Sequence, residues 1–449
     1  MITLTRFQAR QVRAVFLRTL NGSARGSGPV PIQIQADTHG LRLRAGTSAA
    51  AVEFCDPRPF APETLTVPVE LLTQSEGRTH DLVTIERSSP DEVLASWTDE
   101  GVPQLRRYPL VTASADFPPT PASWSDNPGE LLDALQAATQ TADREASRYA
   151  LHRWQLRGDS GQVVATDGRQ LLLQGGFTFP WPGHLLVTPT TVFGSRELPR
   201  PARVQVARTD LHVCLRAGCF TFWLAIDTQG RFPDVDRSMK QPTEASATIE
   251  IAEADAAYVI PVLDRLPGGD EPHGPLTVEA NGSILLRSRS DQAARPTEVL
   301  LPRSRLAGDP LQLNTNRHYL RRALQLGFRQ LHVFGQERTV LCQDAQRSYV
   351  WALLAADDAL PPASDAMRIE PPECRPGRQT MAGRRPGGRA AARLIHATDG
   401  ARAATPDEVL ASLAQLQCQL RDALAQASQF QRWLRRQHKL VPVTRAAAT

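Results

Sequence analysis

The side chains of this sequence that could do covalent chemistry are few and dispersed. Its six cysteines form no Cys-x-x-Cys pair, and none stands beside a histidine at metal-ligand spacing. We find no nucleophile elbow, phosphate-binding glycine loop or zinc-protease motif. Asp167, beside Thr166, suggests acid–base catalysis, but a turn aspartate explains it better. We therefore expect reduced structural thiols, no metal, no cofactor and no enzymatic activity.

Charge is divided unevenly along the chain. Residues 357–449 contain 14 basic and 9 acidic residues, whereas residues 1–356 contain 37 and 38. Any DNA contact by the larger part must therefore come from a local arrangement of charge. No run approaches the ~18 consecutive apolar residues of a membrane span, and the N-terminus lacks a secretion signal. We expect a cytoplasmic protein that binds no membrane.

Length and internal repetition predict three similar units. A chain of 449 residues suggests about three domains at roughly 100–200 residues each. The segments ADFPP at 115–119 and GRFPD at 230–234 are alike, and each follows a strand-rich region. A third unit of the same size ends near residue 354. We place the domains at residues 1–122, 123–241 and 242–356.

Each unit begins with a helix pattern and contains a second one midway. In the second unit, Asp126 or Asn127 can cap a helix with Pro128 in its first turn. Strands with period-2 alternation lie between the helices, and Asn281-Gly282 predicts a hairpin. The helix patterns begin at or cover 7–21 and 69–72, 128–138 and 188–193, and 254–266 and 316–326. This composition is typical of an α+β domain whose two helices cover antiparallel sheets.

Several motifs resemble those of one known family. The segment VVATDGRQL at 163–171, soon after RYAL at 148–151, resembles the middle domain of the bacterial DNA polymerase III beta sliding clamps, which carries ATDG-H-R-L after a YYLNG-like strand. GRFPD at 230–234 is similar to the family's G-[KR]-F-P-D-Y, and LNTNRHYL at 313–320 to its FNxxYLLD. The first unit matches more weakly, through YPL at 108–110 and FP at 117–118. The order and spacing of these motifs carry the resemblance.

The resemblance implies a head-to-tail homodimer of three-domain subunits that closes into a ring around duplex DNA, with helices lining the hole. Such a ring holds DNA by topology, because long-lived phosphate contacts would stop it sliding, yet its hole must tolerate one negative charge per ~1.7 Å of duplex. Arginines three or four residues apart share a helix face, as in Arg10/Arg13 and Arg317/Arg321. The DNA-binding candidates are Arg10, Arg13, Arg18, Tyr149, Arg196, Arg317, Arg321 and Arg322. A solvated outer face for the arginines, and a core position for the tyrosine, are the alternatives.

The resemblance also implies an apolar pocket between the second and third domains, where DNA polymerase, clamp loader and repair proteins dock a short linear peptide. The positions that match its lining are Leu151, Thr166, Gly168, Arg169, Leu171, Pro233, Arg237 and Val350. Core packing is the alternative for the apolar members. Arg169-Gln170 replaces the family's His-Arg pair, Val235 a tyrosine and Ala352 a methionine. We expect a shallower pocket with a changed peptide preference.

The segment after 356 departs from the family, whose members usually stop at the last strand. Residues 357–404, rich in Pro, Gly, Arg and Ala, predict a flexible linker. A capping box at 405–408 and apolar residues at alternating 4/3 spacing predict an amphipathic, coiled-coil helix over 405–440. This helix self-associates, binds a partner or packs on the body. The tail and the altered pocket leave a second interpretation open, a clamp-like paralogue that serves as a non-replicative recruitment or regulatory scaffold.

Overall fold

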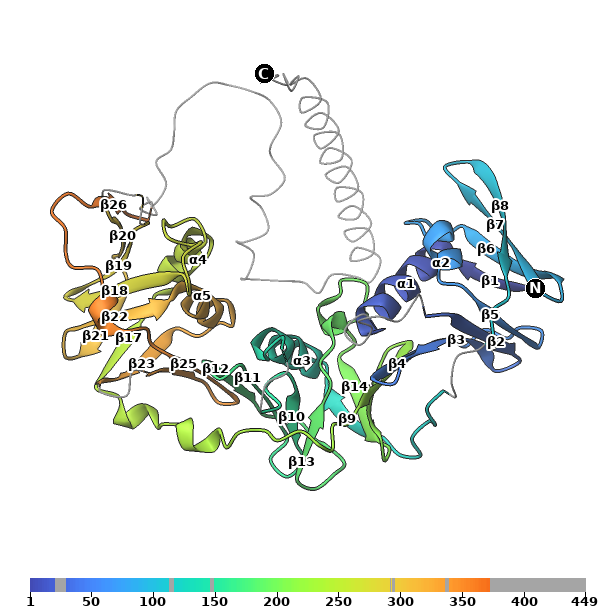
Figure 1. Ribbon diagram of the computed structural model, residues 1–449, viewed down its shortest axis with the longest axis horizontal. Coiled ribbons are helices and arrows are strands. Elements are labelled where there is room, and N and C mark those ends of the chain that lie inside the picture. Colours follow the sequence, from blue (N-terminus) through green and yellow to red (C-terminus); the bar gives the residue numbers. More distant parts are fainter. Residues whose placement is uncertain are drawn as a thin grey trace, which may run out of the picture. The chain divides into compact units, whose positions relative to one another are not determined.

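Antiparallel strands make up most of this fold, and a few helices pack against them (Figure 1). The computed structural model describes residues 1–20, 30–112, 117–145, 149–290, 292, 295–335 and 339–371. The predicted helix at 405–440 and most of the predicted linker lie outside these ranges. Within them, no helix is long and apolar enough to cross a membrane.

One repeating pattern, which we call a half-module, accounts for most of the elements. It consists of a strand, a helical segment and a meander of three antiparallel strands. Module 1 contains two half-modules. The first comprises β1 (Ile2–Thr5), α1 (Arg6–Leu20), β2 (Ile32–Asp37), β3 (Gly40–Gly46) and β4 (Ala50–Asp56). The second comprises β5 (Glu63–Val67), α2 (Glu70–Ser75), β6 (Leu82–Ser89), β7 (Glu92–Asp99) and β8 (Val102–Pro109).

Module 2 repeats this pattern with a shortened second helix. Its first half comprises β9 (Ser125–Pro128), α3 (Glu130–Thr141), β10 (Trp154–Arg157), β11 (Gln162–Thr166) and β12 (Gln170–Gln174). Its second half comprises β13 (His184–Val187), the 3-10 turn η1 (Thr191–Gly194), β14 (Arg203–Arg208), β15 (His212–Ala217) and β16 (Phe220–Ala225). The short turns η2 (Asp236–Ser238) and η3 (Pro242–Glu244) lie in the connection to module 3.

Module 3 adds one short strand to the pattern. Its first half comprises β17 (Ala247–Glu250), α4 (Glu253–Leu263), β18 (Pro275–Asn281), β19 (Ser283–Ser288) and β20 (Thr297–Leu301). Its second half comprises the additional β21 (Arg305–Gly308), then β22 (Leu311–Asn316), α5 (Arg317–Gln325), β23 (Gln330–Phe334), β24 (Thr339–Gln343) and β25 (Arg347–Ala352). The turn η5 (Ala356–Asp358) and β26 (Met367–Ile369) follow. The predicted α+β fold with three similar modules is confirmed.

The two halves of each module exchange their opening strands. β1 opens the first half of module 1 but pairs with β6 of the second, whereas β5 pairs with β2 of the first. Modules 2 and 3 repeat the exchange. In the described residues the sheet orders are β1-β6-β7-β8, β5-β2-β3-β4-β16-β15-β14-β9, β13-β10-β11-β12-β25-β24-β23-β17-β21 and β22-β18-β19-β20-β26. The exchange ties the halves of a module together through backbone hydrogen bonds.

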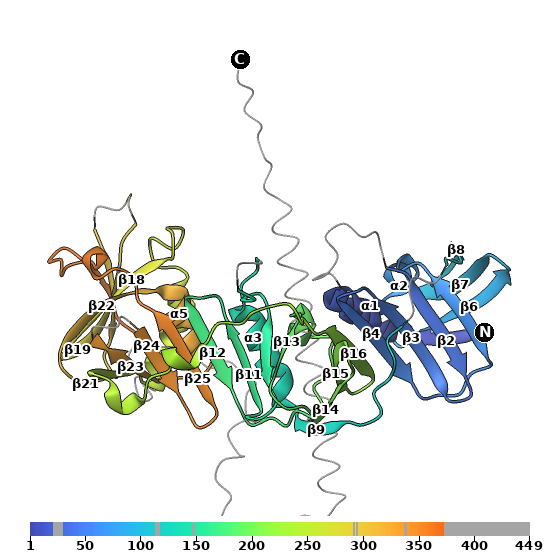
Figure 2. The ribbon, with the colours of Figure 1, turned by 60° about the horizontal axis from the view of Figure 1, so that its bottom comes forward.

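Two of these sheets continue from one module into the next. β4 pairs antiparallel with β16, and β12 with β25, through five residue pairs at each seam. Figure 2 shows β11, β12 and β25 side by side across the second seam. Each seam joins the last strands of two meanders. Among the described residues the remaining two such strands, β8 and β20, pair with no other module.

The helices pack their apolar faces on these sheets. In α1, the buried residues Ala9, Val12, Val15 and Phe16 contact a core that also contains residues of α2 and β4. The interior of modules 1 and 2 is continuous, whereas module 3 has a separate core built around α4 and α5. α1 therefore buries one face and leaves the other open to solvent.

Three predicted details are wrong. The companion helix at 188–193 is only the turn η1, which ends at Gly194 shortly before Pro199. Neither Asp126 nor Asn127 caps α3, because both belong to β9, and the Asn127 amide instead exchanges hydrogen bonds with the backbone of Thr178 at 2.8 Å each. The predicted flexible linker does not begin at 357, because η5 and β26 hold the chain on module 3 as far as residue 371.

Candidate nucleic-acid interface and partner pocket

The face of α1 that points away from the core carries arginines. Arg10 and Arg13 are about one-third exposed, and Arg18 in the last turn is exposed. The end of this helix meets module 2, where the Thr190 hydroxyl donates to the Arg18 carbonyl at 2.9 Å and the Gln11 amide donates to the Glu197 carbonyl at 2.9 Å. These contacts place the helix face beside the segment that follows η1.

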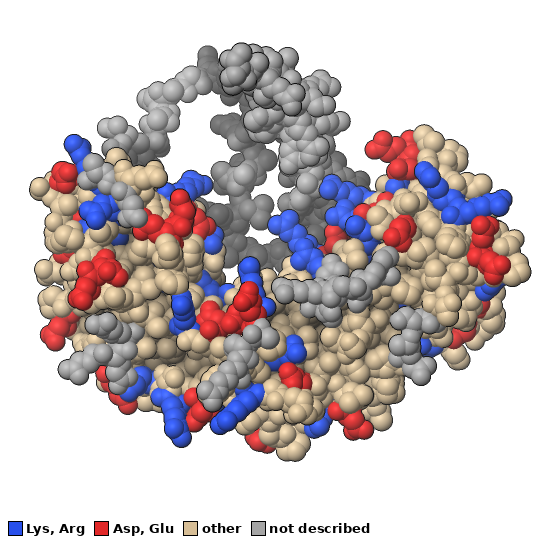
Figure 3. All heavy atoms as spheres, viewed as in Figure 1, with Lys and Arg blue, Asp and Glu red and all other residues tan. Residues whose placement is uncertain are grey.

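An open cleft of about 680 Å³ lies between α1, the segment after α2 and the segment after η1. Two carboxylates partly neutralise it, since Arg10 pairs with Glu197 at 2.7 Å and Arg13 with Glu76 at 3.2 Å. The charged residues in its lining are Arg10, Arg13, Arg18, Arg78, Arg196, Glu76 and Glu197. In Figure 3 basic side chains gather beside α1, with acidic side chains interspersed. We call this the arginine cleft.

Three arginines of the arginine cleft remain available to a ligand. Arg18, Arg78 and Arg196 are exposed, and none pairs with a carboxylate in the part of the chain that the structure describes. Arg10, Arg13, Arg18 and Arg196 were expected from the sequence, and the structure brings these four together. Arg78 was missed because it lies in a loop, where helical spacing gives no signal.

Arg317 was expected to contact DNA, and this expectation is wrong. The residue is 0% exposed. Its guanidinium donates to the carbonyls of Leu266, Pro267, Gly274 and Pro275 at 2.7–3.2 Å. Burial lowers the pKa of this guanidinium from its ordinary value. Arg317 therefore fixes the loop before β18 to the start of α5, so it forms no charged patch with Arg321.

The other candidates of module 3 are also engaged within the protein. Arg321 forms an ion pair with Asp264 at 2.9 Å and remains about one-third exposed. Arg322 reaches across to α3, where it donates to the Ala137 carbonyl at 2.6 Å and the Thr141 hydroxyl at 2.8 Å. Burial lowers the pKa of Arg322. These hydrogen bonds join modules 2 and 3, so the role of Arg322 is corrected to a structural one. Tyr149 of module 2, the last DNA-binding candidate, is 38% exposed.

The apolar members of the predicted peptide pocket meet at the seam of modules 2 and 3. Leu171 of β12 is the register partner of Val350 of β25. Both belong to a small apolar cluster that also contains Phe334 and Leu341. Val235, from the connection between the modules, packs on this cluster and is itself 7% exposed, while Leu171 and Val350 are 6% and 7% exposed. The connection therefore covers most of the apolar surface.

The polar members of the predicted pocket form a turn beside this cluster. The Thr166 hydroxyl donates to the Gln170 carbonyl at 2.6 Å and accepts from the Gly168 amide at 3.0 Å. Gly168 has a φ of +87°, which only glycine adopts readily, and a side chain there would contact Leu151. Arg169 lies within 2.9 Å of the His273 ring. The turn is thus held by its own hydrogen bonds.

The last two predicted pocket members lie on the connection between modules 2 and 3. Arg237 is 88% exposed and forms an ion pair with Asp234 at 2.9 Å. Pro233 is half-buried next to Phe232, which packs against the same apolar cluster. Pro233 therefore lies beside the cluster, whereas Arg237 extends into solvent.

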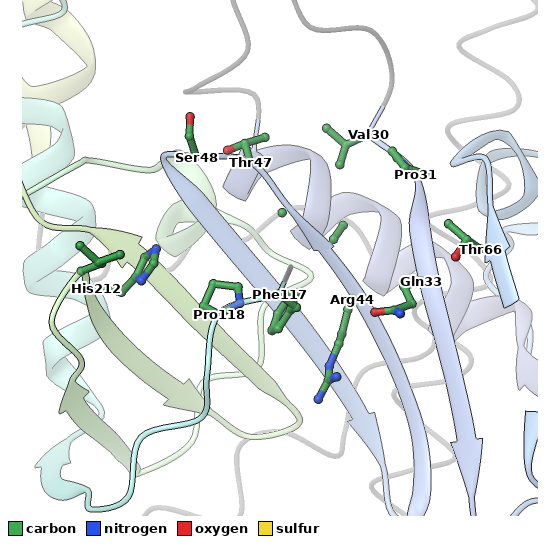
Figure 4. Close-up of a pocket in the computed structure, with 13 residues that line it drawn as sticks. Val30, Pro31, Gln33, Arg44, Thr47, Ser48, Thr66, Phe117, Pro118 and His212 are labelled. Carbon is green, nitrogen blue, oxygen red and sulfur yellow. The ribbon is translucent and has the colours of Figure 1, made fainter. Parts of the chain in front are cut away.

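A hollow that the sequence did not predict lies at the seam of modules 1 and 2. This cavity of about 490 Å³ is lined by Phe117 and Pro118 of the connection, Arg44 of β3 and His212 of β15 (Figure 4). The Arg44 guanidinium lies 5.0 Å from the centre of the Phe117 ring. The likeness of 115–119 to 230–234 was the available signal, because equivalent connections cross equivalent seams.

Solved structures with the same fold are DNA sliding clamps. The DNA polymerase III subunit beta from Pseudomonas aeruginosa superposes with a TM-score of 0.64 at 17% identity, over 79% of this chain and 99% of that one. A sliding clamp from the same organism bound to griselimycin gives 0.65 at 15% identity with the same coverage. The DNA polymerase III beta chain from Streptococcus pneumoniae gives 0.65 at 11% identity, also over 79% and 99%. No protein-family model and no curated protein sequence matches the chain. The chain has the sliding-clamp fold.

Substitution of a buried arginine should change the stability of the protein far more than substitution of an exposed one. Arg317→Met leaves the four carbonyls without their donor and should lower the free energy of unfolding by about 3–5 kcal/mol. Arg18→Met, at an exposed position, should change it by no more than about 0.5 kcal/mol. Urea denaturation followed by fluorescence and circular dichroism measures both. A small effect of Arg317→Met would contradict the structural role.

Proposed function

We propose that this chain is a DNA sliding clamp, a non-catalytic subunit that encircles duplex DNA and holds a DNA polymerase or another DNA enzyme on it. The observation that carries the proposal is the three-module architecture joined by continuous sheets, with an arginine cleft on a helix. The likeness to solved clamps supports the architecture. The function is inferred from the combination of fold and charge.

The electrostatics of the arginine cleft suit a sliding contact. Five arginines and two glutamates line it, so its charge is positive but moderated by the two ion pairs of Arg10 and Arg13. Duplex DNA presents one negative charge per ~1.7 Å along its axis. Exposed guanidinium groups attract this backbone, while the few contacts they offer exchange readily as the ring moves. Arg18, Arg78 and Arg196 are the DNA-contacting residues that we propose.

The strand pairing at the two seams supports a model of ring closure. The last meander strands of the modules pair antiparallel within the chain, as β4 with β16 and β12 with β25. The corresponding strands β8 and β20 belong to modules 1 and 3. We propose that β8 of one copy pairs with β20 of a second, and that two such contacts close a homodimeric ring. β8 is the last strand of its sheet among the described residues, and an open edge of this kind attracts a partner strand.

Partner proteins dock, in this proposal, at the apolar cluster of Leu171, Val235 and Val350. Val235 covers the cluster, so the docking peptide either displaces Val235 or inserts beside it. This cover favours a peptide different from the one that standard clamps accept. A second function, a clamp-like scaffold for recruitment or regulation outside replication, is favoured by the same observation.

A clamp should bind DNA topologically. Protein is mixed with linear plasmid at concentrations at which two copies meet, the DNA ends are ligated, and salt is raised before gel filtration. Because salt weakens electrostatic contacts but opens no ring, a protein fraction should stay with the circle and leave when a restriction enzyme linearises it. Equal loss from circular and linear DNA would contradict encirclement.

The arginine cleft should dominate the salt dependence of DNA binding. Arg18→Gln combined with Arg196→Gln should reduce the slope of log K against log salt by about 1–2, because each phosphate contact contributes about 0.9. Fluorescence anisotropy with a short duplex measures the slope. The control Arg203→Gln removes an exposed arginine from β14 and should leave the slope unchanged. If both variants reduced the slope equally, the cleft would have no special role.

The cover over the pocket should limit peptide binding. A labelled peptide with one glutamine and two apolar anchors should bind Val235→Ala about fivefold more tightly than the unaltered chain, since roughly 50 Å² of newly accessible apolar surface contributes about 1 kcal/mol. Phe117→Ala, which truncates an apolar side chain at the other connection, should not alter the affinity. Tight binding by the unaltered chain would remove the case for a changed preference.

A further inference from the structure

The edge of β20 is occupied by the chain itself. After β25 and η5 the chain turns back over module 3, and β26 lies parallel to β20 with Thr297, Glu298 and Val299 opposite Met367, Arg368 and Ile369. The Met367 amide donates to the Pro296 carbonyl at 2.9 Å. This is the edge on which, under the proposed function, a second copy would pair. Figure 1 places β26 beside β20, and β8 in module 1 far from both.

A buried charge cluster fastens this segment. Arg287 is 1% exposed, and it donates to the Leu360 carbonyl at 2.8 Å and to Glu298 at 2.7 Å. The second oxygen of Glu298 accepts from Arg368 of β26 at 3.2 Å. Burial alone would raise the pKa of the Glu298 carboxyl, but the hydrogen bonds from Arg287 and Arg368 outweigh it and hold that pKa below its ordinary value.

The two ends of the segment are held with different strength. Leu360 donates to the buried Thr277 hydroxyl at 2.8 Å and accepts from both Arg287 and Gln312. By contrast, the Met367 side chain is 63% exposed and that of Arg368 is 57% exposed. The stretch 361–366 between them contains two prolines and only short turns. β26 can therefore leave β20 while Leu360 stays attached.

β26 and β8 each carry an exposed apolar residue followed by an exposed arginine. β8 carries the exposed pair Leu105-Arg106, and β26 carries Met367-Arg368. In either case an arginine can meet the carboxylate of Glu298. β26 pairs through three residues in parallel orientation, whereas each internal seam uses five pairs in antiparallel orientation. Since parallel pairing is slightly weaker per residue, a seam-like contact with β8 is the stronger competitor.

We infer that residues 357–371 are an intramolecular stopper of ring closure, in which β26 occupies the β20 edge until β8 of a second copy displaces it. This inference rests on the proposed ring. It makes assembly a competition between the chain's own strand and that of its partner. The tail of this protein, beyond any partner binding by its last residues, then regulates when the ring closes.

The experiment weakens β26 without touching the modules. Met367→Pro removes the amide that donates to Pro296, and Arg368→Glu sets two carboxylates against each other at Glu298. The full-length double variant should self-associate at least about tenfold more tightly than the unaltered chain in analytical ultracentrifugation, since a hydrogen bond and an ion pair hold β26 in place. Its retention on ligated circular DNA should rise in parallel.

Matched controls separate this effect from a general change. Met367→Ala keeps the backbone amide, and Arg203→Glu reverses an exposed charge on β14; each should associate like the unaltered chain. Adding Arg106→Glu on β8 to the double variant should abolish the gain in self-association. In the proposed pairing, the new carboxylate would meet Glu298 of the second copy and repel it.

The remaining outcomes are distinguishable. If the unaltered chain and the double variant form the same dimer with the same affinity, the stopper is overturned while the ring stands. Amide hydrogen exchange across β20 reports whether β26 has been released in the double variant. If exchange there is faster but neither protein associates, the β20 edge is no assembly surface. The ring then fails, and the stopper fails with it.

Discussion

The need to pair the backbone groups of sheet edges governs this structure. Every half-module ends in a strand whose outer edge would face water unpaired, and an unpaired edge invites aggregation. The chain meets this need by exchanging opening strands within modules and by joining meanders at the two seams. The β4–β16 and β12–β25 contacts then turn three modules into one body. Of the strands that end a half-module, β8 and β20 join no other module, and β26 covers the β20 edge within the described chain.

Arginine serves two opposite purposes in this fold. Arg317 and Arg322 are held by backbone carbonyls and fix a loop and a module boundary, whereas Arg18 and Arg196 face an open cleft. The planar guanidinium, with five donors, suits both uses. A sliding clamp needs the first kind for rigidity and only a few of the second, since many free arginines would hold DNA in one place. The near balance of charge over residues 1–356 agrees with this division.

The sequence predicted the larger features of this fold and fewer of its details. The Asn281-Gly282 hairpin and the threefold repetition follow from local spacing, so they were accessible. The exchange of β1 and β5 was not, because it depends on contacts distant in sequence. Helical spacing brought Arg10 and Arg13 to one cleft correctly, yet the same spacing misjudged Arg317, since spacing does not reveal which carbonyls a folded loop presents. Asn127 failed as a cap for the same reason, as its partner Thr178 is remote in sequence.

Two surfaces that a clamp would offer to others are covered in this chain by its own residues. Val235 covers the apolar cluster at the second seam, and β26 pairs with the β20 edge of module 3, which is the proposed closing edge. Each cover is a short part of a connecting or trailing segment, held by few contacts compared with the sheets beneath it. Short covers of this kind leave the underlying surface folded and ready, so that uncovering it requires breaking a few hydrogen bonds and no refolding of a module. A ring that holds DNA by topology releases it only by opening. The edge at which such a ring closes is therefore the most direct place to control it, and under the proposed function β26 lies on that edge.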